Sequence, residues 1–234
     1  MDKSIIYKLI IDDKIEEIKN MLNKDKTNLY IRGPNEQFPI HDACFYGKKD
    51  VISLFLKYDP GFLNAVDKKF NNCYNLLARY NPDLLVFFIK DYKPTNINLV
   101  NNDGHNTLVS YIIYNKIDEK ILKILKSNGS SLDTDNSNGL YYIINKNKCQ
   151  ELDIIKKYFK LNMNKLNEGI PISYSTLNLN NLECLKYLID NGLNININDR
   201  ALDNLISRSI IDKNYNYLDF LIKQKNMDYR WVMK

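Results

Sequence analysis

Apolar residues recur at helical spacing in short segments along the chain, and these segments resemble one another. Residues 121–133 and 184–196 have the same order of apolar and polar positions, and in each a glycine, Gly129 or Gly192, follows the apolar stretch. Glycine accepts the left-handed conformation that ends many helices. Because the two glycines are 63 positions apart, close to twice an interval of about 33 residues, the pattern indicates repeats of a small helical unit.

Five further segments carry the same apolar pattern and are predicted to be helices: residues 15–22, 51–58, 84–90, 154–159 and 218–223. A shorter helix is predicted before each of the seven. Its clearest opening is residues 38–44, where Pro39 stands in the first helical turn, a position that needs no amide hydrogen. Weaker openings occur at residues 72–74, 106–108 and 171–172. The predicted repeats are residues 1–32, 33–66, 67–99, 100–133, 134–166, 167–198 and 199–234.

The opening at residues 38–44 resembles the Thr-Pro-Leu-His-x-Ala-Ala motif of ankyrin repeats, with Pro39, Ile40, His41 and Ala43 at matching positions. This resemblance extends over essentially the whole chain and is most specific in the second and sixth repeats. It implies an all-α ankyrin-repeat solenoid of about seven helix-turn-helix units, with divergent terminal repeats acting as caps. It also implies that His41 bonds the backbone of a turn. Val109 stands at this histidine position in the fourth repeat, which is therefore expected to lack the bond.

Composition and charge narrow the class of protein. The longest purely apolar run, residues 84–89, is too short to span a membrane, and the N-terminus lacks the features of a signal peptide. We therefore expect a soluble protein of the cytosol or nucleus. The net charge is +5, but basic and acidic residues are interleaved, so nucleic-acid binding is disfavoured. Frequent Asn, Lys and Ile indicate an AT-rich genome, such as that of a large DNA virus, an intracellular bacterium or a protist.

The chain offers little for catalysis or metal binding. His41 and His105 lie in different predicted repeats and make no plausible acid–base pair. The four cysteines, 44, 73, 149 and 184, also lie in separate repeats without the paired spacing of zinc ligands, so buried packing is expected for them. Residues 133–139 match the first half of a calcium loop, but Ile144 stands where the bidentate Glu belongs. We expect no enzyme activity, cofactor, metal ion or small-molecule substrate.

The surface that ankyrin stacks use for protein partners is formed by hairpin tips and first helices. Aromatic residues and arginine supply most binding energy at such surfaces. The residues predicted here to bind protein are Phe45, Tyr46, Lys68, Phe70, Arg79 and Tyr80. Tyr111, Tyr114 and Tyr174 are also placed in first helices. The competing interpretation is that tyrosine is favoured by the codon bias and is half-buried.

The degenerate repeats and AT-rich bias resemble the ankyrin-repeat proteins of poxviruses. That resemblance implies a host-range or immune-evasion factor in the host cytoplasm, which binds and blocks a host antiviral or inflammatory signalling protein. Many members end in an F-box-like segment, and residues 224–234 are too short for one. Two alternatives stay open: an adaptor that recruits substrates to a host ubiquitin ligase, and an ankyrin effector of an intracellular bacterium. A capped solenoid is expected to be a monomer.

Overall fold

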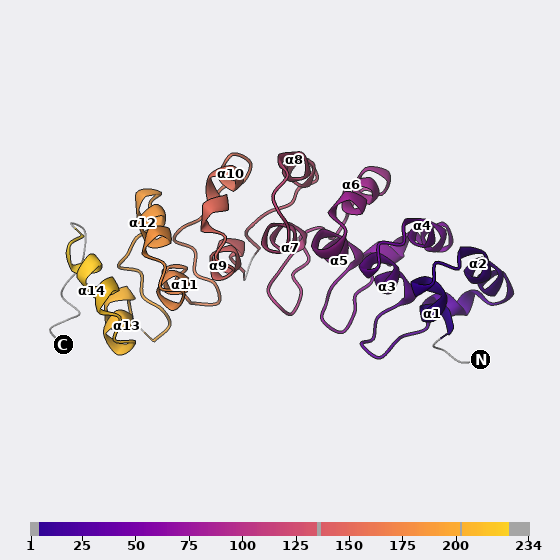
Figure 1. Cartoon of the computed structure of the whole chain (residues 1–234), viewed down its shortest axis with the longest axis horizontal. Helices are drawn as coiled ribbons and strands as arrows, with labels where there is room; N and C mark the ends of the chain where they lie inside the picture. The colour runs from indigo at the N-terminus through magenta and orange to yellow at the C-terminus, as the bar shows by residue number, and fades with distance from the viewer. Residues whose placement is uncertain (1–4, 135–136, 202, 225–234) are drawn as a thin grey trace. The chain divides into compact units, whose positions relative to one another are not determined.

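The computed structural model describes residues 5–134, 137–201 and 203–224, and the regular structure within these ranges is helical (Figure 1). The chain forms two compact bodies, Met1–Ser131 and Leu132–Lys234, called here the N-terminal and C-terminal bodies. No helix among the described residues is both long and apolar enough to cross a membrane. The all-helical prediction is confirmed.

The N-terminal body consists of helix pairs. The first helices are α1 (Ile5–Ile11), α3 (Pro39–Phe45), α5 (Cys73–Tyr80) and α7 (Thr107–Tyr114). The second helices are α2 (Ile15–Lys24), α4 (Lys49–Tyr58), α6 (Pro82–Asp91) and α8 (Glu119–Ser127). Each first helix contacts the next along the chain, and the second helices form another layer. Figure 1 shows the long loops projecting on the side of the first helices away from that second layer.

The core of this body lies between the two layers of helices. Val51 and Phe55 of α4 and Leu77 of α5 have no exposed surface. Ala43 and Ala78, which are also fully buried, let neighbouring first helices approach closely. A single pair of such short helices could not bury its apolar face alone, so stacking of successive pairs supplies the core.

The projecting loops are hairpins that bond to one another at one-repeat intervals. Each is closed by a backbone hydrogen bond, for example from Asp67 N to Asn71 O (3.1 Å). The Lys68 amide donates to the Asn35 carbonyl at 3.0 Å in the preceding hairpin. The Asn102 amide donates to the Lys69 carbonyl at 2.9 Å, which joins the third hairpin to the second. These bonds fix the hairpins as one side of a continuous surface.

The C-terminal body has shorter helices. They are α9 (Gly139–Asn145), α10 (Leu152–Lys156), α11 (Ser173–Asn178), α12 (Leu182–Asp190), α13 (Leu205–Ile211) and α14 (Tyr215–Ile222), with a 3-10 turn at Cys149–Glu151. Gly192, after α12, has a φ of +94°, and Gly129, after α8, has a φ of +79°. Both therefore end helices in the predicted left-handed conformation. Residues 225–234, which include most of the segment weighed against an F-box, lie outside the described residues.

Asparagine side chains make a comparable bond to a backbone carbonyl in repeats that lack the histidine. His41 Nε2 lies 2.9 Å from the Ala65 carbonyl oxygen, across 24 residues. In the third repeat, Asn75 Nδ2 donates to the Leu99 carbonyl at 3.4 Å across the same interval. In the fourth repeat, where Val109 occupies the histidine position, Asn106 Nδ2 donates to the Ser131 carbonyl at 2.7 Å. Val109 cannot make the histidine's own bond, and the N-cap residue of α7 makes a different bond to the following turn.

Candidate protein-binding groove

A cavity of about 190 Å³ opens between the hairpins and the first helices of the N-terminal body. From the hairpins it is lined by polar residues, among them Asn35, Gln37, Asp67, Lys69, Asn101 and Asp103. From α3, α5 and α7 it is lined by residues that include Asp42, Phe45, Arg79, Tyr80, Ser110 and Tyr114. We call this cavity and its lining the groove.

Three exposed aromatic rings meet at the ends of α3 and α5. The ring centroid of Phe45 lies 4.5 Å from that of Tyr80 and 4.9 Å from that of Tyr46. Phe45, Tyr46 and Tyr80 remain 43%, 45% and 40% exposed. Neighbouring aromatic surface of this kind on a soluble protein is typical of a binding site.

Arg79 continues this row toward α7. Its guanidinium carbon lies 3.9 Å from the ring centroid of Tyr114 and 4.9 Å from that of Tyr80. Both distances are within the range of a cation–π interaction. The two rings, which belong to successive first helices, therefore hold the cation inside the groove.

Asparagines from the following repeat fix the helix ends that carry these side chains. Asn81 Nδ2 donates to the carbonyls of Cys44 at 2.8 Å and Phe45 at 3.1 Å, which lie in the last turn of α3. Asn115 Nδ2 donates to the Ala78 carbonyl at 2.8 Å in the last turn of α5. Each bond satisfies a carbonyl that a helix end leaves without an intrahelical partner.

The six residues predicted from the sequence to bind protein separate into two groups. Phe45, Arg79 and Tyr80 line the groove, and Tyr46 packs on Phe45. Lys68 and Phe70 are exposed on the second hairpin. Phe70 has a φ of +60° and is 53% exposed. Lys69, not Lys68, lines the groove, because successive side chains of a turn point in different directions.

Three tyrosines that the sequence places in first helices have different positions. Tyr114 lines the groove. Tyr111 is 1% exposed and Tyr174 is 7% exposed, so neither is part of an open surface. The Tyr111 hydroxyl accepts from the Asp118 amide at 2.6 Å, and the Tyr174 hydroxyl donates to the Asp203 carbonyl at 2.8 Å. Their hydroxyl groups thus fasten loops, a role that short-range sequence pattern could not distinguish from surface contact.

Burial changes the proton affinities of two groups in the groove region. Desolvation lowers the pKa of His41, against hydrogen bonds with the backbone of Ala65 and Phe38 that raise it. Desolvation raises the pKa of Asp42, while a hydrogen bond with Gln37 lowers it. The Phe38 amide donates to His41 Nδ1 at 2.9 Å, so this nitrogen is the acceptor of a neutral ring. The geometry gives His41 a structural role.

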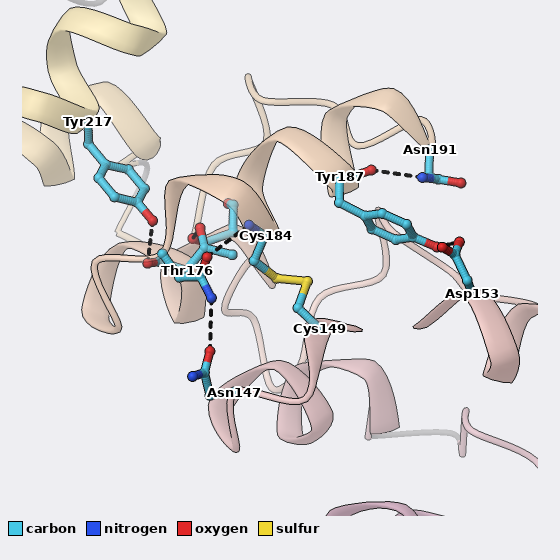
Figure 2. The surroundings of a disulfide bond; sticks show 10 residues. Asn147, Cys149, Asp153, Thr176, Cys184, Tyr187, Asn191 and Tyr217 are labelled. Atoms are coloured by element: carbon cyan, nitrogen blue, oxygen red, sulfur yellow. Dashed lines mark hydrogen bonds between the residues drawn. A yellow bond between two sulfur atoms is a disulfide. The ribbon is translucent and has the colours of Figure 1, made fainter. Parts of the chain in front are cut away.

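Two of the cysteines form a disulfide bond in the C-terminal body. Cys149 and Cys184 are 35 residues apart in sequence, and their Cα atoms lie 5.7 Å apart (Figure 2). The expectation of free, buried thiols is wrong for this pair. Its members are about one repeat apart and lie where the second helices of adjacent repeats begin, so stacking brings them together. Figure 2 also shows the hydroxyl of Tyr187, on α12, bonded to Asp153 Oδ1 of α10, at 2.9 Å.

Cys44 and Cys73 are free and buried, as expected. Burial is the largest of the causes that raise the pKa of the Cys44 thiol well above its usual range, and a hydrogen bond with Cys73 adds to it. The nucleophilic form of cysteine is the thiolate. The Cys44 sulfur is therefore protonated at neutral pH and unsuited to attack a substrate.

The segment that resembles a calcium loop lies partly outside the described residues. Its ends form an isolated antiparallel bridge between Asp133 and Asn138, and the Thr134 amide donates to the Ser137 carbonyl at 3.1 Å. These contacts agree with a turn. Among the described residues, no three His, Cys, Asp or Glu side chains are grouped so that they could hold a metal ion.

Comparison with known proteins supports the fold. No family model matches the chain. A putative ankyrin repeat protein of Acanthamoeba polyphaga mimivirus is 24% identical over 228 residues, which cover 93% of this chain. The chain spans only 30% of the length of that relative. The crystal structure of the ankyrin repeat domain of Bcl-3, a member of the IkappaB family, matches 90% of this chain and 97% of its own, with a TM-score of 0.66 and 16% identity.

The stacked helix pairs, projecting hairpins and structural match define an all-α ankyrin-repeat fold. The chain is thus similar in sequence to the putative ankyrin repeat protein of the mimivirus and similar in fold to the Bcl-3 domain. This fold is typical of protein-binding modules. The repeat boundaries given above stay predictions.

Proposed function

We propose that the chain is a non-catalytic protein-binding module whose partner occupies the groove of the N-terminal body. The observation that carries this proposal is the row of Phe45, Tyr80 and Arg79 along the groove, exposed and held by neighbouring residues. Rigid aromatic side chains provide contact area at low entropic cost, and arginine is enriched among the residues that supply most binding energy. Stacked hairpins form the facing wall, which gives an extended partner segment two sides to contact.

The viral relative gives this proposal a biological setting. Because that relative belongs to a virus of an amoeba, we propose that the partner is a host protein. Binding would sequester or block it, in the manner of a host-range or immune-evasion factor that acts on host antiviral or inflammatory signalling. A non-catalytic chain can do this by binding alone. A partner segment held in the groove would be unable to contact the partner's other binding proteins.

Affinity capture tests the proposal. The wild-type chain and the triple variant Phe45→Ala/Arg79→Ala/Tyr80→Ala are immobilised, exposed to Acanthamoeba cytosol and compared by quantitative mass spectrometry. Tyr215→Ala is the matched control, because Tyr215 is 69% exposed but lies in the C-terminal body. Circular-dichroism melting first establishes that all three chains are folded.

The proposal predicts host proteins that the wild type and Tyr215→Ala retain and that the triple variant loses. Equal recovery of the same proteins by a folded triple variant would place binding outside the groove. A separate Lys68→Ala/Phe70→Ala variant tests the second hairpin, and a partial loss of the same partner would extend the contact surface to that tip.

A further inference from the structure

We propose that Arg79 is a receptor for a carboxylate, and that the partner segment in the groove carries Asp or Glu beside an apolar or aromatic residue. This inference rests on the proposed function, since it assigns the chemistry of the occupant of the same groove. It commits the partner to an acidic peptide segment. Arg79 would then be the residue that favours this acidic segment over apolar peptides that carry no carboxylate.

The two tyrosine rings fix the orientation of the Arg79 side chain. Its guanidinium carbon lies 3.9 Å from the Tyr114 ring centroid and 4.9 Å from the Tyr80 ring centroid. An arginine held by aromatic rings keeps its N–H donors in the plane of the guanidinium group, in a fork that matches the two oxygens of a carboxylate. Orientation before binding reduces the entropy lost when the complex forms.

Arg79 lacks an anionic partner within the described part of the chain. Two other arginines of the chain use their side chains internally. Arg32 Nη1 donates to the Glu36 carbonyl at 2.7 Å, and Arg208 Nε lies 3.4 Å from Asp212 Oδ2. No ion pair or side-chain hydrogen bond joins Arg79 to a described residue, so its donors are available to a ligand.

The acidic residues that line the groove, Asp42, Asp67 and Asp103, form no ion pair with Arg79. Asp67 Oδ1 accepts from the amides of Lys69 at 2.8 Å and Asn71 at 2.9 Å, which ties its carboxylate to the hairpin turn. Asp42 is mostly buried and bonds Gln37. Asp103 lies on the third hairpin and is exposed to solvent. Lys69, also exposed, adds a second positive charge to the groove wall.

The apolar part of the proposed segment follows from the rings beside Arg79. Phe45 and Tyr80 pack edge to face with centroids 4.5 Å apart and leave about two-fifths of each side chain exposed, 43% and 40%. Aromatic pairs of this geometry bury large apolar area when a ligand covers them. A residue adjacent to the acid in an extended peptide would lie over them.

The test begins with a library of random dodecapeptides displayed on phage and panned against the whole chain. The most enriched peptide is synthesised together with versions in which each Glu or Asp is replaced by Gln or Asn. Binding is measured by fluorescence anisotropy to the wild type, Arg79→Leu, Arg79→Lys and Arg32→Leu. Arg32 is the matched control, since its guanidinium also lies over a ring, 4.1 Å from the Phe38 centroid, but it does not line the groove.

We expect the enriched peptides to share an acidic residue. Replacement of one carboxylate by its amide should weaken binding to the wild type and to Arg32→Leu by about 10-fold or more, the range for hydrogen bonds to charged groups. The same replacement should change binding to Arg79→Leu less than about 2-fold, because the coupled partner is already absent. Arg79→Lys keeps the charge without the fork and should show an intermediate loss.

Two results would overturn the inference about Arg79: enriched peptides without a shared acid, or an amide effect as large in Arg79→Leu as in the wild type. The peptide replacements are made against the unchanged wild-type protein, so misfolding of a variant cannot produce the expected effect. The variant Phe45→Ala/Tyr80→Ala separates the two proposals. If it binds the peptides as tightly as the wild type, the groove itself is not the site and the proposed function fails as well.

Discussion

His41 Nε2 lies 2.9 Å from the carbonyl oxygen of Ala65, 24 residues further along the chain. The Phe38 amide donates to the other ring nitrogen, Nδ1, at 2.9 Å. The ring therefore links the start of α3 to the turn that leads to the second hairpin. The ring is 2% exposed, and both of its hydrogen bonds are partly buried.

Replacing His41 by Ala should destabilise the N-terminal body. The change leaves the Phe38 amide and the Ala65 carbonyl without their partner, and each buried unpaired group costs about 1–3 kcal/mol. Urea unfolding followed by circular dichroism should show a lower free energy of unfolding. An unchanged unfolding midpoint would contradict a structural role for this histidine.

The pH dependence of stability should also change in His41→Ala. Burial lowers the pKa of His41 below its usual value of about 6.5, so the unfolded chain binds the proton more readily than the folded one. The stabilisation that neutral His41 provides is complete above about pH 6.5 and is lost as the pH falls toward its lower folded-state pKa. We expect a positive slope of unfolding free energy against pH over this window in the wild type. A slope of equal size in the variant would show that another group causes it.

Asn106 should contribute to stability through two separate bonds. Its Oδ1 accepts from the Val109 amide at 3.0 Å as the N-cap of α7, and its Nδ2 donates to the Ser131 carbonyl at 2.7 Å. Asn106→Ser keeps an acceptor for the N-cap bond, but the serine side chain is too short to reach the Ser131 carbonyl. This variant should lower the free energy of unfolding by about 1 kcal/mol. Asn106→Ala loses both bonds and should cost roughly 2 kcal/mol or more. Equal stability of the two variants by urea unfolding would show that the cap is unimportant.

Reduction of the Cys149–Cys184 bond should destabilise the C-terminal body. A disulfide that closes 35 residues restricts the unfolded chain and contributes about 4 kcal/mol in a chain-entropy estimate. Thermal melting of this body should shift to lower temperature in the presence of a phosphine reductant. The double variant Cys149→Ser/Cys184→Ser should melt at the lower temperature with or without reductant. The free pair Cys44 and Cys73 gives the internal control, since a Cys44→Ser variant should keep the sensitivity to reductant.

The disulfide bond needs an oxidising environment, whereas the cytoplasmic location expected from the sequence is a reducing one. Disulfides are rare in the cytosol because its thiol pools reduce them. Alkylation of the chain inside intact cells, followed by mass spectrometry of the peptides that contain Cys149 and Cys184, measures which state is present. Alkylated Cys149 would mean that the C-terminal body works without the stabilisation of its disulfide.

Tyr217 should be important for the last helix pair described. It has no exposed surface, and its hydroxyl donates to the Thr176 carbonyl of α11. Tyr217→Phe keeps the packed ring and removes one of the two hydrogen bonds that this carbonyl accepts, the other coming from the Asn181 amide at 2.8 Å. The free energy of unfolding of the C-terminal body should therefore fall by about 0.5–1.5 kcal/mol. Amide exchange of residues 203–224 should become faster, while exchange in the N-terminal body stays the same. Equal exchange rates in the variant and the wild type would contradict this account.

The repeats were predictable from sequence because apolar spacing and glycine position are local properties. Gly129 and Gly192 marked their helix ends correctly for this reason. The roles of Asn75 and Asn106 were missed, since frequent asparagine was attributed to codon bias. Their partners, Leu99 and Ser131, are 24 and 25 residues away, so only the stacked structure reveals the bonds.

The positions of the side chains that line the groove were predictable to a similar extent. Phe45, Arg79 and Tyr80 could be placed at the ends of first helices by counting along the repeat. Tyr111 and Tyr114 are three residues apart on one helix, yet one is buried and the other lines the groove. Which of the two tyrosines is buried depends on how α7 packs against α5. The local sequence pattern does not specify that packing.

Hydrogen–deuterium exchange of the wild-type chain, alone and bound to the most abundant protein captured from Acanthamoeba cytosol, tests the binding site most directly. Peptides are followed over the whole chain, so both bodies are compared in one experiment. The account predicts slower exchange on binding in residues 35–46, 67–81 and 101–115, which form the groove and its helix ends. Slower exchange confined to the C-terminal body, with these three segments unchanged, would contradict it.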